Sequence, residues 1–132
     1  MAMVTAFIPG GYPPEIKERL IAALGDVECI GFTMPRIYEH VYVNEFDADH
    51  ADEVMKKTKY LVIYTGAGKV LAAKEKIAEL FRSKCDEIFG KEDTLYASVI
   101  LEEHSNDMIS CEGEMRCEDP EAVAAQRAYQ TM

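Results

Sequence analysis

A strand, a glycine-containing turn and a helix follow one another twice in this sequence, and this repeat constrains the fold more than any other feature. The later copy has an apolar run at residues 60–65, the turn Gly-Ala-Gly-Lys at residues 66–69, and a periodic run that extends from about residue 71 to residue 89. A short apolar run that is broken by glycines and followed by a longer period of 3.6 residues predicts a strand, a tight turn and a helix.

The earlier copy shows the same order of elements. Its apolar run covers residues 3–8, its turn contains Gly10 and Gly11, and prolines stand at positions 13 and 14. Proline is tolerated in the first turn of a helix because the N–H groups there have no partner within the helix. We expect this helix to continue to Leu24 and to end at Gly25, since glycine is favoured just past a helix end.

A further strand is expected after each helix, at residues 40–45 and 98–103. Gly11 precedes Gly68 by 57 residues, and Val41 precedes Val99 by 58 residues. This nearly constant offset indicates a duplication of one βαβ unit, about residues 2–46 and 60–104. The sequence therefore predicts a single α/β (α+β) domain with a tail at 105–132. The pattern of the tail is compatible with a small hairpin at residues 111–113. Pro120 favours a short helix at residues 121–129, and a mobile tail is the alternative that stays open.

Composition and charge exclude several classes of partner. The chain has 132 residues, 48% of them hydrophobic, which is sufficient for one domain with a buried core. No apolar run approaches the roughly 20 residues needed to span a bilayer. A net charge of -10 disfavours nucleic acid and anionic membranes as partners. A small anionic molecule in a local basic pocket remains compatible with this charge.

The cysteines do not indicate a disulfide framework or a metal site. Cys29, Cys85, Cys111 and Cys117 show no tight C-x-x-C spacing, and the sequence opens with a strand pattern instead of a signal peptide. We therefore expect reduced thiols and a cytoplasmic protein. Cys111 and Cys117 with His104 lack the close spacing of zinc ligands, so neither a metal nor another cofactor is expected.

Short motifs in both halves resemble the tautomerase superfamily. Gly-Ala-Gly-Lys at 66–69, with Ala-Glu-x-Phe at 78–81 and Glu-Glu at 102–103, is similar to the second half of 5-carboxymethyl-2-hydroxymuconate isomerases. Gly-Tyr-x-Pro-Glu at 11–15 is similar to the opening of 4-oxalocrotonate tautomerase. The resemblance covers roughly residues 2–104. It implies a duplicated βαβ fold, with a four-stranded sheet and two helices on one face. It also implies a homotrimer, because single-unit relatives form hexamers.

Members of that superfamily use an amino-terminal proline, exposed by removal of the initiator methionine, as a general base or acid. The matching residue here is Ala2. Because alanine is small, we expect Met1 to be removed, which leaves a primary amine with an ordinary pKa of about 7.7–8.0. Two interpretations stay open: the amine of Ala2 acts as the base, or Ala2 only begins a strand and the proline chemistry is lost.

The resemblance also implies which residues bind the substrate. The arginine of the first turn corresponds to Tyr12 in the first unit and to Lys69 in the second, and the arginine before the next strand corresponds to His40 and Ser98. The candidate substrate-binding residues are Lys69, His40, Tyr12 and Arg36. The implied function is proton transfer on a small unsaturated or keto carboxylic acid. Two alternatives remain: a non-catalytic oligomeric binding or structural protein on the same scaffold, and a ferredoxin-like dimer that binds a small ligand.

Overall fold

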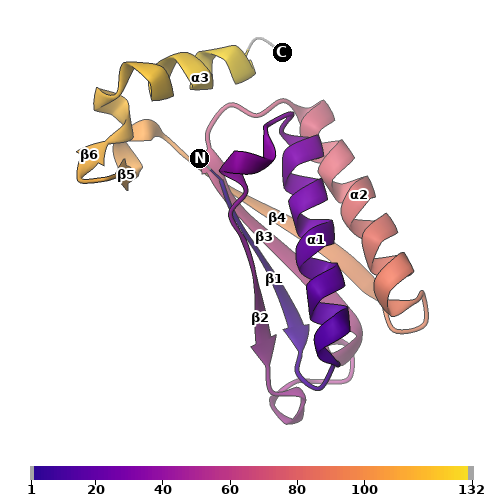
Figure 1. Ribbon diagram of the computed structural model, residues 1–132. Helices are drawn as coiled ribbons and strands as arrows, with labels where there is room; N and C mark the ends of the chain where they lie inside the picture. The colour runs from indigo at the N-terminus through magenta and orange to yellow at the C-terminus, as the bar shows by residue number, and fades with distance from the viewer. Residues whose placement is uncertain (1, 131–132) are drawn as a thin grey trace.

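The computed structural model describes residues 2–130 and shows one sheet, two long helices and a smaller carboxy-terminal segment (Figure 1). The helices and strands are, in chain order, β1 Met3–Pro9, α1 Pro14–Gly31, β2 Val41–Phe46, β3 Thr58–Gly66, α2 Leu71–Phe89, β4 Tyr96–His104, β5 Ser110–Cys111, β6 Glu114–Met115 and α3 Pro120–Gln130. Short 3-10 turns lie between them, including Arg36–Tyr38 before β2 and Arg116–Glu118 before α3.

The main sheet has four strands in the order β2-β1-β3-β4. β1 pairs in parallel with β2, and Val4 lies opposite Val41; β3 pairs in parallel with β4, and Leu61 lies opposite Val99. β1 and β3 meet at the centre of the sheet as an antiparallel pair. In each βαβ unit the two strands are therefore direct neighbours. A ferredoxin-like fold places another strand between them, so that alternative is wrong.

Both long helices lie on the same side of the sheet, and the core is between these two layers (Figure 1). Alternate residues of the central strands face the helices, because side chains alternate between the two faces of a strand. Burial of each large apolar side chain contributes about 1.5–3 kcal/mol to stability. The fully or almost fully buried members of this core are Val4, Ala6, Ile8, Leu20, Leu24, Val27, Leu61, Ile63, Ile77 and Phe81.

The first helix is longer than the sequence indicated, and the expectation that it ends at Gly25 is wrong. α1 continues through Gly25 and ends at Gly31. A side chain at Gly25 would collide with the side chains of Glu39 and Arg36, which pack across the helix at this point. The glycine is therefore required by the close approach of the following segment. The second helix ends where the periodic run of the sequence ends, because α2 spans Leu71–Phe89 and is followed by Gly90, whose φ is 82°.

The opposite face of the sheet carries apolar side chains that no helix covers within residues 2–130 (Figure 1). Met3, Tyr42, Tyr64 and Ile100 each expose about two fifths of their surface there: 42%, 42%, 41% and 41%. Phe7, Tyr60 and Val62 are half-buried on the same face. An exposed apolar patch of this kind is typical of a protein–protein interface.

The carboxy-terminal segment contains the expected hairpin, β5–β6, and the expected helix, α3. Gln126 of α3 holds the helix to the sheet end: its Nε2 donates to the carbonyl oxygen of Ala67 at 3.2 Å, and its Oε1 accepts from Asn106 Nδ2 at 2.6 Å. Figure 1 shows α3 beyond the end of the sheet at which the chain begins. Among residues 2–130, no helix has the length and apolarity that crossing a membrane requires.

Candidate active site

A cavity of about 420 Å³ lies where β1 begins and β3 ends. These two strand ends meet because the strands are antiparallel, with Met3 opposite Tyr64. One wall comes from the sheet and the segment after α1, and the other comes from the carboxy-terminal segment. The lining residues are Ala2, Phe32, Thr33, Met34, Pro35, Tyr38, His40, Thr65, Lys69, Arg116, Asp119, Glu121, Ala122 and Ala125.

Ala2 lies at the inner side of this cavity. Its exposed fraction is 6%, and it belongs to the hydrophobic core together with Val4 and Phe32. Thr65, which is 2% exposed, lines the cavity from the end of β3. An amine on Ala2 would therefore stand at the boundary between an apolar interior and a polar cavity.

Lys69 enters the cavity from the turn between β3 and α2. Gly68 has a φ of 94°, a backbone conformation that glycine adopts without strain, and this bend carries the next residue over the strand end. The ammonium of Lys69 donates to the carbonyl oxygen of Gly66 at 3.2 Å and lies 5.7 Å from the centre of the Phe32 ring. Burial lowers the pKa of Lys69, and the nearby carboxylate of Glu103 opposes that shift.

His40 and Tyr38 form the side of the cavity next to β2. The carbonyl oxygen of His40 accepts the backbone N–H of Val4 at 2.8 Å, which fixes the start of β2 beside the start of β1. The Nδ1 atom of His40 is 2.7 Å from the carbonyl oxygen of Tyr38, which holds the imidazole ring in place. His40 therefore presents an oriented ring to the same space as Ala2 and Lys69.

Arg116 is a cavity residue that the sequence analysis did not identify. It comes from the 3-10 turn before α3, and its guanidinium Nη1 is 3.6 Å from Asp119 Oδ2. Because Arg116 lies 114 residues after Ala2, no local spacing links them, and only the docking of the carboxy-terminal segment brings them together. With Lys69, it places two cations on the cavity wall.

The structure does not bring Tyr12 and Arg36 into this cavity. Arg36 lies beside α1, where its guanidinium is bonded to Asp26 and is 3.6 Å from Glu39. Tyr12 follows the far end of β1 and donates its hydroxyl to Asp93 at 2.5 Å. Of the residues that the resemblance implied, Ala2, Lys69 and His40 share the cavity within one chain.

Comparison with known structures decides which fold this is. The chain is similar to "F6 fused 4-OT wild type asymmetric trimer", with a TM-score of 0.77 and 15% identity over 89% of this chain and 98% of the other. The chain has the tautomerase fold. It is also similar to a malonate semialdehyde decarboxylase structure (TM-score 0.68, 15% identity, 85% and 92% covered) and to a domain of unknown function from Sebaldella termitidis (TM-score 0.65, 18% identity, 87% and 99% covered). No protein-family model and no curated protein matches the sequence.

In this tautomerase fold the second unit has a lysine at the position that corresponds to Ala2. The offset of 57 residues aligns Val4 with Leu61 and Ala2 with Lys59, and Val4 and Leu61 both face the helices. The Lys59 side chain is fully buried at the opposite end of the sheet. Its ammonium donates to the carbonyl oxygen of Asp93 at 2.5 Å and lies 4.7 Å from the centre of the Phe89 ring. The Lys59 side chain thus fills the space at the end of the sheet that lies opposite the cavity.

Glu28 is a buried carboxyl group directly beneath the cavity. It lies on the sheet-facing side of α1 with no exposed surface, and both of its oxygens are 3.3 Å from the backbone nitrogen of His40. Burial raises the pKa of Glu28 to about 7, although the N–H and the charge of His40 act in the opposite direction. Nothing in the sequence marks this residue as buried, because a glutamate in an amphipathic helix is ordinarily solvated.

The raised pKa of Glu28 predicts a specific pH dependence of stability. Between pH 4.5 and about pH 7 the folded protein retains a proton that the unfolded chain has lost, so the contribution of Glu28 to stability falls as the pH rises through this window. The loss reaches at most about 3 kcal/mol, from about 1.4 kcal/mol for each pKa unit. Urea unfolding at pH 5 and pH 8 should therefore show that the difference in stability between Glu28→Gln and the wild type shifts in favour of the variant as the pH rises. An equal difference at both pH values would contradict the raised pKa.

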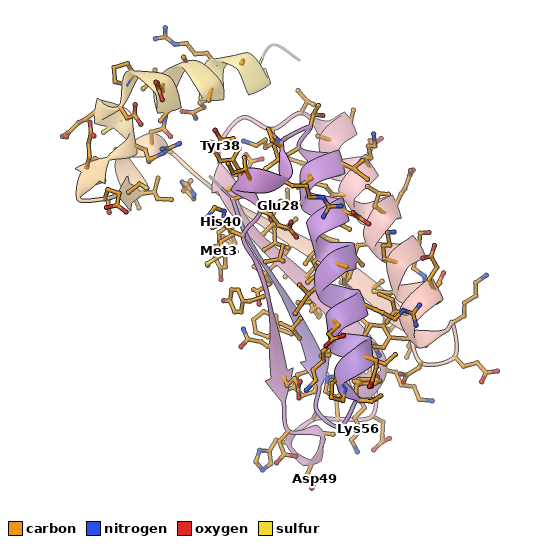
Figure 2. All side chains as sticks on the ribbon, in the orientation of Figure 1. Met3, Glu28, Tyr38, His40, Asp49 and Lys56 are labelled. Carbon is orange, nitrogen blue, oxygen red and sulfur yellow. The ribbon has the colours of Figure 1, made fainter. Side chains whose placement is uncertain are left out.

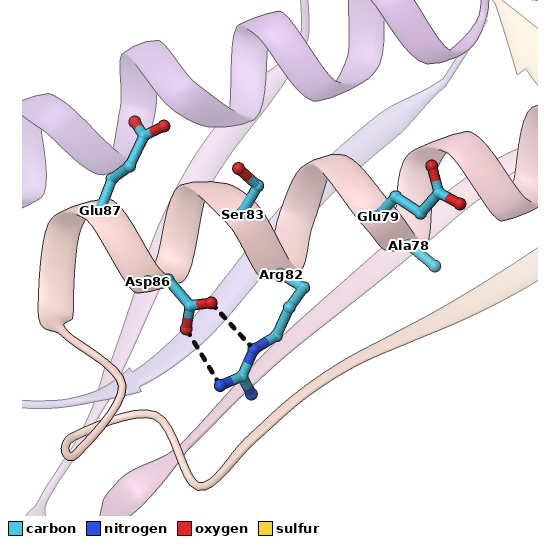
Figure 3. A pocket seen from close by; sticks show the side chains of 6 residues that line it. All are labelled: Ala78, Glu79, Arg82, Ser83, Asp86 and Glu87. Atoms are coloured by element: carbon cyan, nitrogen blue, oxygen red, sulfur yellow. Dashed lines mark hydrogen bonds and ion pairs between the residues drawn. The ribbon is translucent and has the colours of Figure 1, made fainter.

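A second depression, of about 730 Å³, follows the outer surface of α2 (Figure 3). Its lining residues all come from this one helix, and its polar centre is the ion pair of Arg82 with Asp86, in which Nη2 and Oδ1 are 3.0 Å apart. No second element closes over it, so it offers no enclosed site. Within the described residues, no cluster of three or more histidine, cysteine, aspartate or glutamate side chains could hold a metal ion.

Proposed function

We propose that this protein is a tautomerase-superfamily enzyme that transfers a proton on a small unsaturated or keto carboxylic acid, with the primary amine of Ala2 as the base. The observation that carries the proposal is the meeting of Ala2, Lys69 and His40 in one cavity of about 420 Å³. A volume of this size is in the range of small-molecule sites. Removal of Met1 would place an amine at its inner wall.

The surroundings suit an amine base. A buried amine loses hydration in its charged form, and a nearby ammonium such as that of Lys69 also disfavours a second positive charge. Both effects lower the pKa of the amine, which increases the neutral fraction available to accept a proton near pH 7. The ring of Phe32 and the side chain of Thr65 exclude water from one side of this position.

The cations on the cavity wall would hold the acid group of the substrate. Arg116 can bind a carboxylate through two N–H groups, and Lys69 can stabilise the negative charge that develops on a carbonyl oxygen during enolisation. Asp119 and Glu121 line the same cavity and limit the number of negative charges that it accepts. These groups favour a small substrate with one carboxylate beside the reacting carbonyl.

Lys69→Ala is expected to weaken the binding of a small keto acid such as pyruvate about tenfold or more, because a hydrogen bond to a charged group contributes about 1.5–3 kcal/mol. Lys69→Arg keeps the charge and should retain most of the affinity. Titration calorimetry of both variants against the wild type measures the effect. Equal affinities for wild type and Lys69→Ala would place the anion elsewhere.

We also propose that three copies assemble through the open face of the sheet. Met3, Tyr42, Tyr64 and Ile100 expose apolar surface there, and burial of this surface would drive association. Four of the similar structures are described as trimers of fused 4-OT, two asymmetric and two symmetric. Sedimentation at micromolar concentration should show a trimer, and Tyr64→Glu should dissociate it. A stable wild-type monomer would contradict this assembly.

Two measurements test the proposed activity. Mass spectrometry of the purified protein should show a chain that begins at Ala2, and a crystal soaked with pyruvate should show the keto acid between Ala2 and Lys69. The alternative, a non-catalytic binding protein on the same scaffold, is favoured by the single observation that position 2 is alanine and not proline. Binding of the keto acid without any proton exchange at its α-carbon would support that alternative.

A further inference from the structure

We propose that Glu28 is a positioning residue whose carboxylate forms an ion pair with the amine of Ala2. This inference rests on the proposed function in one respect, namely that Met1 is removed so that Ala2 carries the amine. It adds a residue from the last turn of α1 to the site. Glu28 does not line the cavity and would act on the substrate only through the amine.

A chain of backbone contacts places Glu28 below the start of β1. The N–H of His40 points to both oxygens of Glu28, and the carbonyl oxygen of His40 accepts the N–H of Val4. Ala2, two residues before Val4, lies on the same helix-facing side of the strand because side chains alternate along it. Figure 2 shows Glu28 and His40 at this end of the sheet, whereas Asp49 and Lys56 lie at the other end.

Glu28 also has acceptor capacity that its described contacts do not use. A carboxylate offers about four lone-pair positions, and within residues 2–130 a single N–H donor, that of His40, lies 3.3 Å from each oxygen. A fully buried carboxyl group with one long shared hydrogen bond is costly unless a further donor or a cation is present. The ammonium of a trimmed amino terminus would supply both.

The other charged and titratable groups around Glu28 do not replace this partner. Glu39, from the segment before β2, is negative and raises the pKa of Glu28, whereas the N–H and the charge of His40 lower it. Cys29, the next residue of α1, has its own pKa raised by burial first and then by Glu39 and Glu28. The positive charge of Arg36 is directed to Asp26 and Glu39. An amine on Ala2 would supply the cation that these groups do not supply to Glu28.

The consequence for the site is that Glu28 would change how strongly the amine of Ala2 binds a proton. A carboxylate paired with the amine would stabilise the ammonium form and fix the direction of its N–H bonds, while Lys69 acts in the opposite sense. The balance of the two would set the pH at which the amine changes from acid to base. Removal of the charge at Glu28 should therefore weaken the binding of a proton to the amine, and should leave the cavity wall unchanged.

The test is a titration of the amine itself. In protein labelled with ¹³C-alanine, the Ala2 methyl resonance, assigned by its absence from Ala2→Ser, is followed against pH by NMR. We expect the amine of Glu28→Gln to bind its proton at least tenfold more weakly than the wild type, and that of Glu28→Asp to be intermediate. Glu53→Gln, which removes an exposed carboxylate paired with Lys56 at the far end, should match the wild type.

The outcomes separate this inference from the proposed activity. An Ala2 titration that is identical in the wild type and in folded Glu28→Gln would overturn the ion pair and leave Glu28 as a structural acceptor for the His40 N–H. The readout needs no substrate. An absence of turnover would therefore count against the proposed function alone, while a shifted titration would still establish the pair.

Discussion

Ala2→Pro is expected to ketonise phenylenolpyruvate about 10²-fold faster than the wild type, which should be slow. A positioned acid–base group typically contributes about 10²–10⁴-fold to a rate. The primary amine of Ala2 can rotate about its bond to the α-carbon, whereas the nitrogen of proline is held in a ring, so its lone pair is directed at the substrate. Stopped-flow or steady-state absorbance at the wavelength at which the enol absorbs measures the rate.

Two matched variants control this experiment. Ala2→Ser keeps a small residue and a primary amine, so it should lose Met1 and retain the slow rate of the wild type. Ala2→Glu places a large residue after Met1, so Met1 should be retained and the residual rate should disappear. If Ala2→Pro folds normally and shows no increase, the cavity serves a purpose other than enol–keto transfer. If the wild type is already fast, a primary amine is sufficient here.

Lys59→Ala is expected to lower the free energy of unfolding by about 3 kcal/mol, within the range of about 2–5 kcal/mol for truncation of a long buried side chain to alanine. The Lys59 side chain has no exposed surface and contacts the ring of Phe89. Its loss leaves a cavity and removes the donor to the carbonyl oxygen of Asp93. Urea unfolding followed by circular dichroism measures the change, with the slope checked for a two-state transition.

Lys59→Met separates packing from charge. Methionine fills most of the space of the lysine stem, and Asp93, whose side chain is 39% exposed, can be hydrated when its cation is removed. Replacement of a buried ionic group by an apolar one of similar volume is often close to neutral, so we expect a loss of about 1 kcal/mol or less. Equal destabilisation by Lys59→Met and Lys59→Ala would show that the charge and not the packing stabilises this end.

The duplicated pattern in the sequence was sufficient to predict the elements and their order, while the strand order of the sheet excluded the ferredoxin-like alternative. Strands and helices have different hydrophobic periods, and the near-constant offset between Gly11 and Gly68 and between Val41 and Val99 indicates two equivalent units. The end of α2 at Gly90 was also predictable, because its signal is local. Gly25 carries the same local signal within a helix that continues, because the approach of Glu39 and Arg36 requires a glycine there. That approach is a tertiary contact and leaves no mark in the local pattern.

The resemblance of the sequence to the tautomerase superfamily also implied Ala2, Lys69 and His40, because these residues match the family's proline and arginine positions. Only the tertiary structure showed that these three share a cavity and that Tyr12 and Arg36 lie outside it in one chain. It likewise added Arg116 and Glu28. The physical reason is the antiparallel pairing of β1 with β3, which brings the start of the first unit to the end of the second. The carboxy-terminal segment then contributes Arg116 to the cavity, and the buried face of α1 places Glu28 beside His40. These are tertiary contacts, and no spacing in the sequence indicates them.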